Sequence, residues 1–333
     1  MSALLELQSV SRLFPVGPRG RQRLHAVDGV DISIAAGESI GLVGESGCGK
    51  STLSRLVARL IDASGGKLRF DGQDVGGVPA KRFMSHPLRG EIQMVFQDAS
   101  DSLNPRHTAY ESIAEPLRLL KGLRDEAPLR ARVEEVATQV GLPLALLARY
   151  PHQLSGGQKA RVGIARAIAP GPKLLILDEP TAALDVSVQA VVLNLLADLR
   201  EQLGMSYLFV SHDLNVVRLL CDRVFVMYLG KVVESGPVAE VFASPLHPYT
   251  QALVSAIPGT VPADKATRAG GEPMSPIDPD PRTCRFYGRC ARSGGRCNTE
   301  MPLLRPLLDG REAACHHPLN ADLPVRIPSS HDA

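Results

Sequence analysis

The chain has 333 residues, of which 44% are hydrophobic and 22% are charged, an ordinary composition for a globular protein of one large or two smaller domains. The formal net charge of +2 gives no strong field that would favour nucleic acid as the main partner, so no nucleic acid is expected. No apolar run approaches the roughly 18 residues of a membrane span, and the N-terminus lacks a basic region followed by an apolar core, so we predict no transmembrane helix and no signal peptide.

Strand-like and helix-like segments alternate along the chain. An apolar run at 39–44 predicts a buried strand that enters a loop, and helical spacing follows over 50–60. Further strands are predicted at 67–70, 91–96, 173–177, 206–210 and 223–227, and helices within 108–149, broken near Gly122 and Gly141, and over 186–203. This alternation favours an α/β fold with a mainly parallel sheet.

The composition changes near residue 257. Six prolines lie between residues 258 and 281, with glycine and serine among them, which predicts a linker or irregular arm. Two of the six cysteines, Cys48 and Cys221, are isolated in sequence, whereas the other four are crowded into the tail: Cys284, Cys290, Cys297 and Cys315. In a cytosolic chain such a cluster suggests a metal more than disulfides.

One segment matches the phosphate-binding pattern G-x-x-x-x-G-K-[ST]. Its residues are Gly44, Glu45, Ser46, Gly47, Cys48, Gly49, Lys50 and Ser51, followed by Thr52. The glycines let backbone N–H groups point at phosphates, and a helix that begins near Lys50 adds its positive end. Lys50 supplies a charge for the β- and γ-phosphates, and Ser51 a hydroxyl for Mg²⁺. Because a strand precedes the loop and a helix follows it, ATP binding is favoured over a chance glycine-rich turn.

An apolar strand that ends in two carboxylates complements this loop. The segment Leu174–Glu179 places Asp178 where it could hold Mg²⁺, and Glu179 where it could act as general base on the attacking water. Many buried strands end in acids, so this segment alone is a weak signal. Together with the phosphate loop it predicts ATP hydrolysis.

A third motif carries a family resemblance. The sequence LSGGQ, with Ser155, Gly156, Gly157 and Gln158, stands before a basic helix just upstream of the acidic strand. This order of motifs resembles the nucleotide-binding subunits of ABC transporters over about residues 5–255. The resemblance implies a P-loop NTPase (RecA-like) α/β core, an N-terminal antiparallel β subdomain, an inserted helical subdomain at about 98–165, and a cysteine-containing C-terminal extension at 256–333.

The resemblance also implies roles for single residues. In the family, the LSGGQ segment caps the γ-phosphate bound by an opposite subunit, and the loop at Asp185 reaches across that dimer. Gln97 is similar to the glutamine that contacts Mg²⁺ and water, although alone it would read as a polar strand end. His212 resembles the histidine that holds the γ-phosphate and Glu179, although a lone histidine is more often structural. Phe14 is the candidate to stack on adenine.

Two further segments resemble the oligopeptide, dipeptide and nickel import branch: 102–106 (SLNPR) and 244–251 (SPLHPYTQ). The tail spacing C-x₅-C-x₆-C-x₁₇-C is similar to a cysteine set of that branch that can hold a [4Fe-4S] cluster. Four thiolates also suit tetrahedral zinc, in which His316 or His317 could replace a ligand, and unliganded thiols remain a third interpretation.

The resemblance therefore implies an ATP-hydrolysing subunit of an importer for peptides or a related solute. Its expected cofactors are ATP, Mg²⁺ and the cluster, with zinc as the alternative. Its expected partners are a second ABC ATPase chain, two membrane-spanning permease subunits and an extracytoplasmic solute-binding protein, with the chain held peripherally at the cytoplasmic face of the inner membrane. The rival hypotheses are an exporter ATPase and a non-transport ABC protein of DNA repair or translation.

Overall fold

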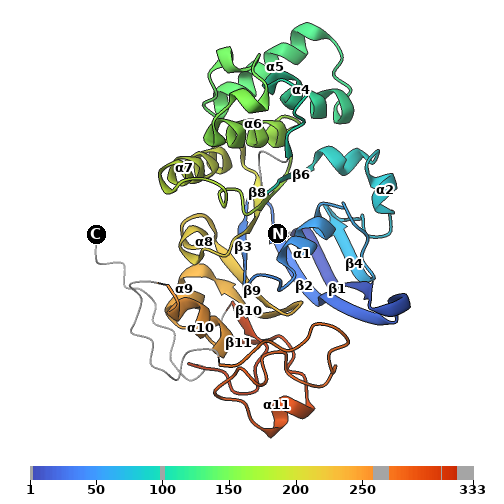
Figure 1. Cartoon of the computed structure of the whole chain (residues 1–333), viewed down its shortest axis with the longest axis vertical. Helices are drawn as coiled ribbons and strands as arrows, with labels where there is room; N and C mark the ends of the chain where they lie inside the picture. Colours follow the sequence, from blue (N-terminus) through green and yellow to red (C-terminus); the bar gives the residue numbers. More distant parts are fainter. Residues whose placement is uncertain (1–2, 98–101, 258–269, 309, 321–333) are drawn as a thin grey trace.

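Two β-sheets form the centre of the computed structural model, which describes residues 3–97, 102–257, 270–308 and 310–320 (Figure 1). The large sheet has the strand order β11-β12-β10-β9-β3-β8-β7-β6 and the small sheet the order β2-β1-β4-β5. The strands are β1 (Ala3–Val16), β2 (Gln22–Ala35), β3 (Ser39–Val43), β4 (Gly65–Phe70), β5 (Gln73–Asp74), β6 (Ile92–Val95), β7 (Leu174–Asp178), β8 (Ser206–Val210), β9 (Arg223–Tyr228), β10 (Lys231–Pro237), β11 (Arg305–Leu308) and β12 (Arg311–Ala313).

Helices cover the large sheet and extend beyond it. The α-helices are α1 (Lys50–Val57), α2 (Ala80–Phe83), α4 (Ala109–Leu120), α5 (Glu126–Gln139), α6 (Gly156–Ile168), α7 (Val186–Leu203), α8 (Leu214–Leu220), α9 (Val238–Ala243), α10 (Pro248–Ser255) and α11 (Gly295–Thr299). Short 3₁₀ turns lie at η1 (Pro18–Gly20), η2 (Pro87–Gly90), η3 (Leu144–Leu146) and η4 (Pro151–Gln153). Helices α4, α5 and α6 gather at one end of the molecule, and α11 lies at the other (Figure 1).

The central strands are buried on both faces, as their continuous apolar sequences require. In β7, Leu175 and Leu177 belong to one hydrophobic core, and Leu174 and Ile176 to a second core on the opposite face. The first core also takes in side chains of helices α4 to α9. The second takes in α1 and the apolar face of the small sheet. The small sheet therefore packs on the large one as a second layer.

The large sheet corrects the expectation of a mainly parallel sheet. The pairs β9–β3, β3–β8, β8–β7 and β7–β6 are parallel. The pairs β9–β10, β10–β12 and β12–β11 are antiparallel, so the sheet is mixed. The physical reason is that residues 305–313 of the tail fold back as a hairpin and extend the sheet beyond β10. The sequence did not predict β11 or β12.

Most of the predicted elements are confirmed within a residue or two. The strand predicted at 206–210 and the helix predicted at 186–203 have these bounds in β8 and α7. Helix α1 ends at Val57 rather than near residue 60, because Arg59 adopts a left-handed conformation with φ 53°. The expected helical breaks at Gly122 and Gly141 are also left-handed, with φ 65° and 64°.

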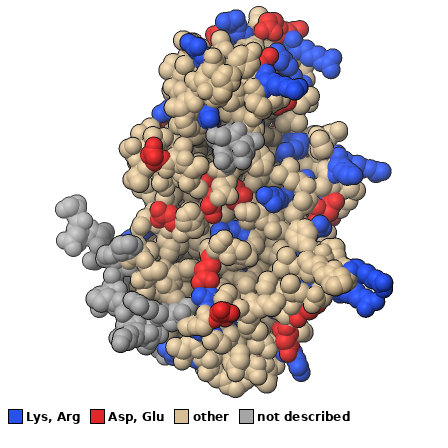
Figure 2. All heavy atoms as spheres, in the orientation of Figure 1, with Lys and Arg blue, Asp and Glu red and all other residues tan. Residues whose placement is uncertain are grey.

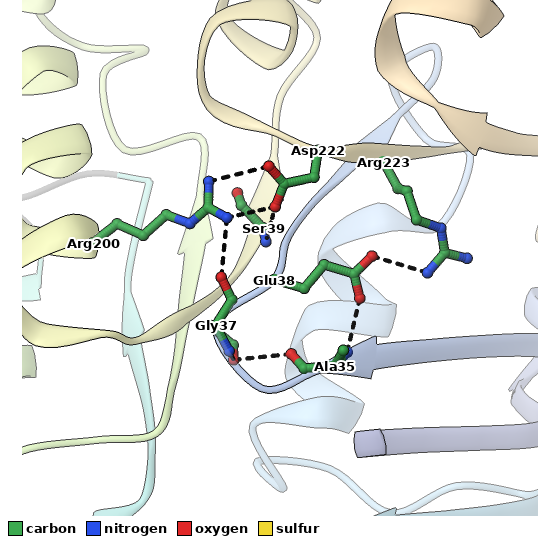
Figure 3. Close-up of polar contacts among 8 residues, drawn as sticks. Ala35, Gly37, Glu38, Ser39, Arg200, Asp222 and Arg223 are labelled. Atoms are coloured by element: carbon green, nitrogen blue, oxygen red, sulfur yellow. Dashed lines mark hydrogen bonds and ion pairs between the residues drawn. The ribbon is translucent and has the colours of Figure 1, made fainter. Parts of the chain in front are cut away.

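The start of β3 is fixed by a group of ion pairs between distant segments (Figure 3). The Asp222 carboxylate accepts a hydrogen bond from the Ser39 backbone N–H at 2.9 Å and is paired with Arg200 of α7. The Arg223 guanidinium lies 3.0 Å from the Glu38 carboxylate. These contacts bind the first residues of β3 to α7 and β9, and so position the loop at the other end of the strand.

The described part of the tail is bound to the core through a buried carboxylate. Glu234 of β10 is fully buried and accepts 2.8 Å hydrogen bonds from the backbone N–H groups of Leu246 and His247. Arg311 of β12 donates to the same carboxylate at 3.2 Å. Of the arm predicted at 257–281, residues 258–269 lie outside the described residues, and 270–281 are irregular as expected.

Acidic and basic side chains are interspersed on the face shown in Figure 2. The near-zero net charge of the chain therefore does not arise there from two opposed patches of single sign. Among the helices in the described part of the chain, none is long and apolar enough to cross a membrane.

Candidate nucleotide site

The loop after β3 requires glycine at two positions. Gly44 has φ 152°, and a Cβ added there would lie 2.1 Å from the Met227 carbonyl oxygen. Gly49 has φ 108°, and its Cβ would lie 2.0 Å from the Ala26 carbonyl oxygen. Both distances are far below van der Waals contact, so no side chain fits. The strands on either side therefore compress the loop into a tight turn at the start of α1.

Lys50 is held inside this loop. Its ammonium donates to the backbone oxygens of Gly44 at 2.7 Å and Glu45 at 3.0 Å, and the residue is 6% exposed. Lys50 is also the first residue of α1, so its charge adds to the positive end of the helix. The loop thus places a cation and free helix N–H groups on one side of a cavity, an arrangement that can bind phosphate.

A carboxylate and a hydroxyl meet beside the lysine. The Ser51 hydroxyl donates to Asp178 Oδ1 at 3.3 Å, and Asp178 is 4% exposed at the end of β7. Burial raises the pKa of Asp178, and the neighbouring Glu179 carboxylate raises it further. Oxygen ligands of this kind suit Mg²⁺, whose charge would offset the desolvation of the carboxylate. The residues present therefore fit the expected metal.

Glu179 is the centre of a second polar group. Its carboxylate Oε2 accepts from Gln97 Nε2 at 3.2 Å and lies 3.2 Å from His212 Nδ1. Glu179 has φ 48°, a left-handed conformation that is uncommon for a residue with a Cβ. This backbone turn directs the side chain away from the β7 strand and toward Gln97 and His212. A carboxylate so placed can orient and deprotonate a water molecule.

These residues surround one cavity of about 400 Å³. Ten predicted site residues line it: Phe14, Ser46, Gly47, Gly49, Lys50, Ser51, Thr52, Gln97, Glu179 and His212. Gly44, Glu45 and Cys48 shape the loop behind the cavity, and Asp178 is attached to it through Ser51. The structure therefore brings together the phosphate loop, the acidic strand and two segments more than 30 residues from either.

Apolar side chains also line the cavity. Phe14 of β1 is one of them, with the Arg12 guanidinium 4.6 Å from its ring centroid. The remaining lining residues, which the sequence reasoning missed, are Leu24, His25, Ala26, Leu229 and Pro276. Pro276 belongs to the tail, and its carbonyl accepts from the His25 backbone N–H at 2.9 Å. An aromatic ring in such a lining offers a flat base a surface on which to stack.

The LSGGQ segment lies outside this cavity. Ser155 caps α6, because its hydroxyl accepts from the Gln158 N–H at 3.3 Å while Gln158 Oε1 accepts from the Ser155 N–H at 2.9 Å. A Cβ added to Gly157 would lie 2.8 Å from Val188, so the segment packs on the start of α7, next to Asp185. None of Ser155, Gly156, Gly157, Gln158 or Asp185 lines the cavity.

The four tail cysteines converge without forming a ligand set. Cys284, Cys290, Cys297 and Cys315 line one small cavity of about 10 Å³, together with Arg292, His316 and His317. Burial raises the pKa of Cys315 to about 12 and raises those of Cys284 and Cys290, so these thiols are neutral unless a metal displaces the proton. Within the described residues, no group of three or more His, Cys, Asp or Glu side chains is arranged to hold a metal ion.

The tail also reaches the phosphate loop, a contact that sequence reasoning did not predict. Arg289 forms a two-pronged ion pair with Glu45, at 2.9 and 3.1 Å. The Tyr249 hydroxyl accepts from the Glu45 backbone N–H at 2.8 Å. The only sequence signal was the position of Tyr249 within the SPLHPYTQ segment, which marked a branch of the family rather than a contact.

Comparison with known proteins identifies the family. The family model for ABC transporters matches residues 27–182, and the model for the C-terminal region of oligopeptide/dipeptide transporters matches residues 233–297. The di/tripeptide transport ATP-binding protein DppF of Pseudomonas aeruginosa is 44% identical over 95% of this chain and 98% of its own length. The oligopeptide transport ATP-binding protein OppF of Salmonella typhimurium is 48% identical over 84% of each chain.

The chain belongs to the ABC transporter family of ATP-binding proteins. A solved structure agrees: the ATP-binding cassette MJ0796, in a dimeric post-hydrolysis state bound to ADP and Pi, superposes with a TM-score of 0.64 at 30% identity. That match covers 70% of this chain and 98% of the other. The chain is thus an ATPase of the ABC type.

Proposed function

We propose that this chain hydrolyses ATP to energise the import of dipeptides or oligopeptides across a cytoplasmic membrane. The observation that carries the solute class is the match of residues 233–297 to the C-terminal region of oligopeptide/dipeptide transporters. The names of the relatives DppF and OppF support the same class. An exporter ATPase or a non-transport ABC protein is not favoured by either.

The phosphate side of the site binds the charged end of ATP. Lys50 and the N–H groups of Gly47, Gly49 and the start of α1 hold the β- and γ-phosphates. Ser51, Asp178 and Gln97 would hold Mg²⁺, which would supply positive charge beside the transferred phosphoryl group. Phe14 stacks on the adenine, and Pro276 also lines the cavity.

Glu179 acts as general base in this proposal. Gln97 and His212 both contact its Oε2, each at 3.2 Å, and all three residues line the cavity. A proton of the water passes to Glu179 as the water oxygen attacks the γ-phosphorus. The bond between the γ-phosphorus and the bridging oxygen breaks, and the products are inorganic phosphate and ADP, whose β-phosphate stays beside Lys50. His212 is 65% exposed and can also reach the γ-phosphate.

The remaining site residues serve a second nucleotide. The LSGGQ segment does not line the cavity of its own chain. Its residues cap the γ-phosphate on a second ABC ATPase subunit: Ser155, Gly156, Gly157 and Gln158. Asp185 contacts that subunit. Residues 5–255, with helices within about 98–165 as an inserted subdomain, form the ATPase domain, and 256–333 form the extension.

Closure and reopening of this dimer move two membrane-spanning permease subunits. An extracytoplasmic solute-binding protein delivers the solute to these permeases. The chain then lies at the inner face of the cell membrane as a peripheral subunit. Substrate choice belongs to the permeases and the binding protein in this proposal.

Glu179→Gln tests the chemistry, since it keeps the shape of the side chain and removes the base. Hydrolysis should fall by roughly 10²–10⁴-fold, the usual contribution of a general base, while ATP binding remains. Steady-state phosphate release and equilibrium ATP binding measure the two effects. Unchanged turnover in the variant would show that another group takes the water proton.

Uptake of labelled peptides by cells that carry or lack this chain tests the solute class. Loss of di- or oligopeptide uptake, restored by the intact chain and not by Glu179→Gln, is the expected result. Co-purification with nucleic acid rather than permease subunits, or accumulation of a solute inside cells that lack the chain, would support the rivals.

We also propose that Cys284, Cys290, Cys297 and Cys315 take up a metal centre. The support is that all four thiols line one cavity beside Arg292. As described, that cavity of about 10 Å³ has room for one water-sized atom, so a single zinc ion needs less movement than a four-iron cluster. Anaerobic purification with absorption spectra and metal analysis decides between iron with sulfide and zinc, and a metal-free protein would contradict both.

A further inference from the structure

The tail reaches the nucleotide site at two separate places. At one of them, Leu24 of β2 and Ile277 form an antiparallel bridge, and the Asp278 carboxylate accepts from the Arg23 backbone N–H at 3.0 Å. At the other, Arg289 pairs with Glu45 of the phosphate loop. Leu24 and Pro276 line the cavity, whereas Glu45 and Arg289 do not, so the tail meets the cavity wall at one place and the phosphate loop at the other.

The pair between Arg289 and Glu45 is held by several contacts of the Arg289 side chain. The Arg289 side chain is 11% exposed, and both of its terminal nitrogens face the Glu45 carboxylate. Its guanidinium also donates to the Tyr228 hydroxyl at 3.1 Å and lies 5.8 Å from the centroid of the Phe286 ring. A two-pronged pair of this kind fixes the orientation of both partners as well as their separation. Glu45 is thereby held in one position.

Glu45 connects this pair to the lysine that meets the phosphates. The Glu45 carbonyl oxygen accepts from the Lys50 ammonium at 3.0 Å, and its backbone N–H donates to Tyr249. Movement of Glu45 would therefore displace a hydrogen-bond acceptor of Lys50 as well as the loop backbone. Glu45 itself does not line the cavity, so Arg289 acts on the nucleotide only through the loop.

We propose that Arg289 of the tail is a positioning residue of the ATP site, which holds the phosphate loop in its binding conformation through Glu45. The inference rests on the proposed function of the loop and adds a part of the molecule to it. Without the pair, the loop must be ordered when the nucleotide binds, and part of the binding free energy is lost in ordering it.

Arg289→Met tests this in the full-length chain, with Mg²⁺ and a non-hydrolysable ATP analogue as the probe. The dissociation constant should rise roughly ten-fold, the scale of a partly buried, two-pronged charge pair. Arg296→Met is the matched control. Arg296 lies in the same tail, but both it and its partner Glu300 are more than half exposed. Their ion pair is with each other and not with the phosphate loop.

A double-mutant cycle separates positioning from a general loss of structure. Glu45→Gln removes the other partner, so it should weaken binding by a similar factor, and the Arg289→Met/Glu45→Gln pair should be no weaker than either single variant. Arg289→Lys, which keeps the charge and loses the fork, should recover part of the affinity. Thermal melting without nucleotide checks that each variant is folded.

Three results would overturn the inference. One is an Arg289→Met variant that binds the analogue as tightly as Arg296→Met does. Another is full additivity in the cycle, which would mean that the two residues act separately. If the unaltered chain bound no ATP, the proposed function would fall and this inference with it, so the two failures are distinguishable.

Discussion

At the scale of one residue, the Asp178 carboxylate lowers the stability of the protein at a position that the proposed function needs. Its carboxylate is 4% exposed, and burial raises its pKa, with Glu179 next to it as a second acid. A folded-state pKa above the unfolded value means that the native state binds the proton more tightly. Stability is therefore lost as the pH rises through the folded pKa, so the ionised carboxylate destabilises the nucleotide-free protein at neutral pH.

Asp178→Asn should remove this destabilisation. Without nucleotide, the melting temperature at pH 7 should rise by roughly 2–4 °C, the shift that about 1 kcal/mol gives in a domain of this size. The unaltered protein should melt at a higher temperature with ATP and Mg²⁺ than with ATP and a chelator. This difference should disappear in the variant, because an amide is a poor ligand for Mg²⁺. Differential scanning calorimetry with and without Mg²⁺ measures both. A variant that is less stable than the unaltered protein, or that keeps the Mg²⁺ effect, would contradict the assignment.

Residues of the site differed in how far the sequence predicted them. Lys50 and Ser51 were predicted because they belong to the phosphate-loop pattern that follows β3, and Asp178 and Glu179 because they stand at the end of the apolar strand β7. Pro276 and Arg289 were missed. Arg289 meets Glu45 across 244 positions of sequence, and no local pattern marks which tail arginine faces the loop.

At the scale of an element, β3 is held at one end by charges and shaped at the other by glycines. Asp222 holds its first residue through the Ser39 N–H and joins it to Arg200 of α7 (Figure 3). Ser39 is fully buried, so loss of this acceptor leaves a backbone donor without a partner in the interior.

Asp222→Ala should therefore lower the free energy of unfolding by about 1–3 kcal/mol. The dissociation constant for ATP at a temperature where the variant is folded should change little, since the nucleotide meets the opposite end of the strand. Urea unfolding followed by circular dichroism measures the first effect. Asp280→Ala, which breaks an exposed pair with Arg282, is the control and should be nearly neutral. Equal stability of the two variants would contradict the role given to Asp222.

The strands of the core could be predicted because they are completely buried, as β3 is. Residues 174–178 and 206–210 are buried along their whole length, and continuous short apolar runs between turn signals have few alternative structures. Strands β11 and β12 have four and three residues, and β11 is partly exposed, so their sequences carry no such run. They form because β10 offers them an open edge, which is a tertiary effect.

At the scale of the whole molecule, the LSGGQ segment is separate from the cavity beside the phosphate loop. Lys50 and Glu179 line one cavity, and the LSGGQ segment at the start of α6 does not line it. A helix start with a free N-terminal face and a cavity open on one side are complementary halves of a site. In the proposed dimer, one chain supplies both halves but to two different ATP molecules, so each ATP needs a second ABC ATPase chain.

Ser155→Arg and Lys50→Ala should separate these halves. Lys50→Ala removes the charge that meets the phosphates within the chain, so the isolated variant should lose ATP binding and the assembled transporter should lose hydrolysis at that site. Ser155→Arg fills the helix start instead. The isolated variant should bind ATP like the unaltered chain, because its own cavity is intact, whereas hydrolysis in the co-purified assembly should fall by roughly 10²-fold or more, as when a charge-stabilising group of the site is lost. Equilibrium binding with the single chain and phosphate release by the assembly give the two readouts. If Ser155→Arg weakened binding by the isolated chain as much as Lys50→Ala does, the segment would serve its own nucleotide, and the division of the site between two chains would be wrong.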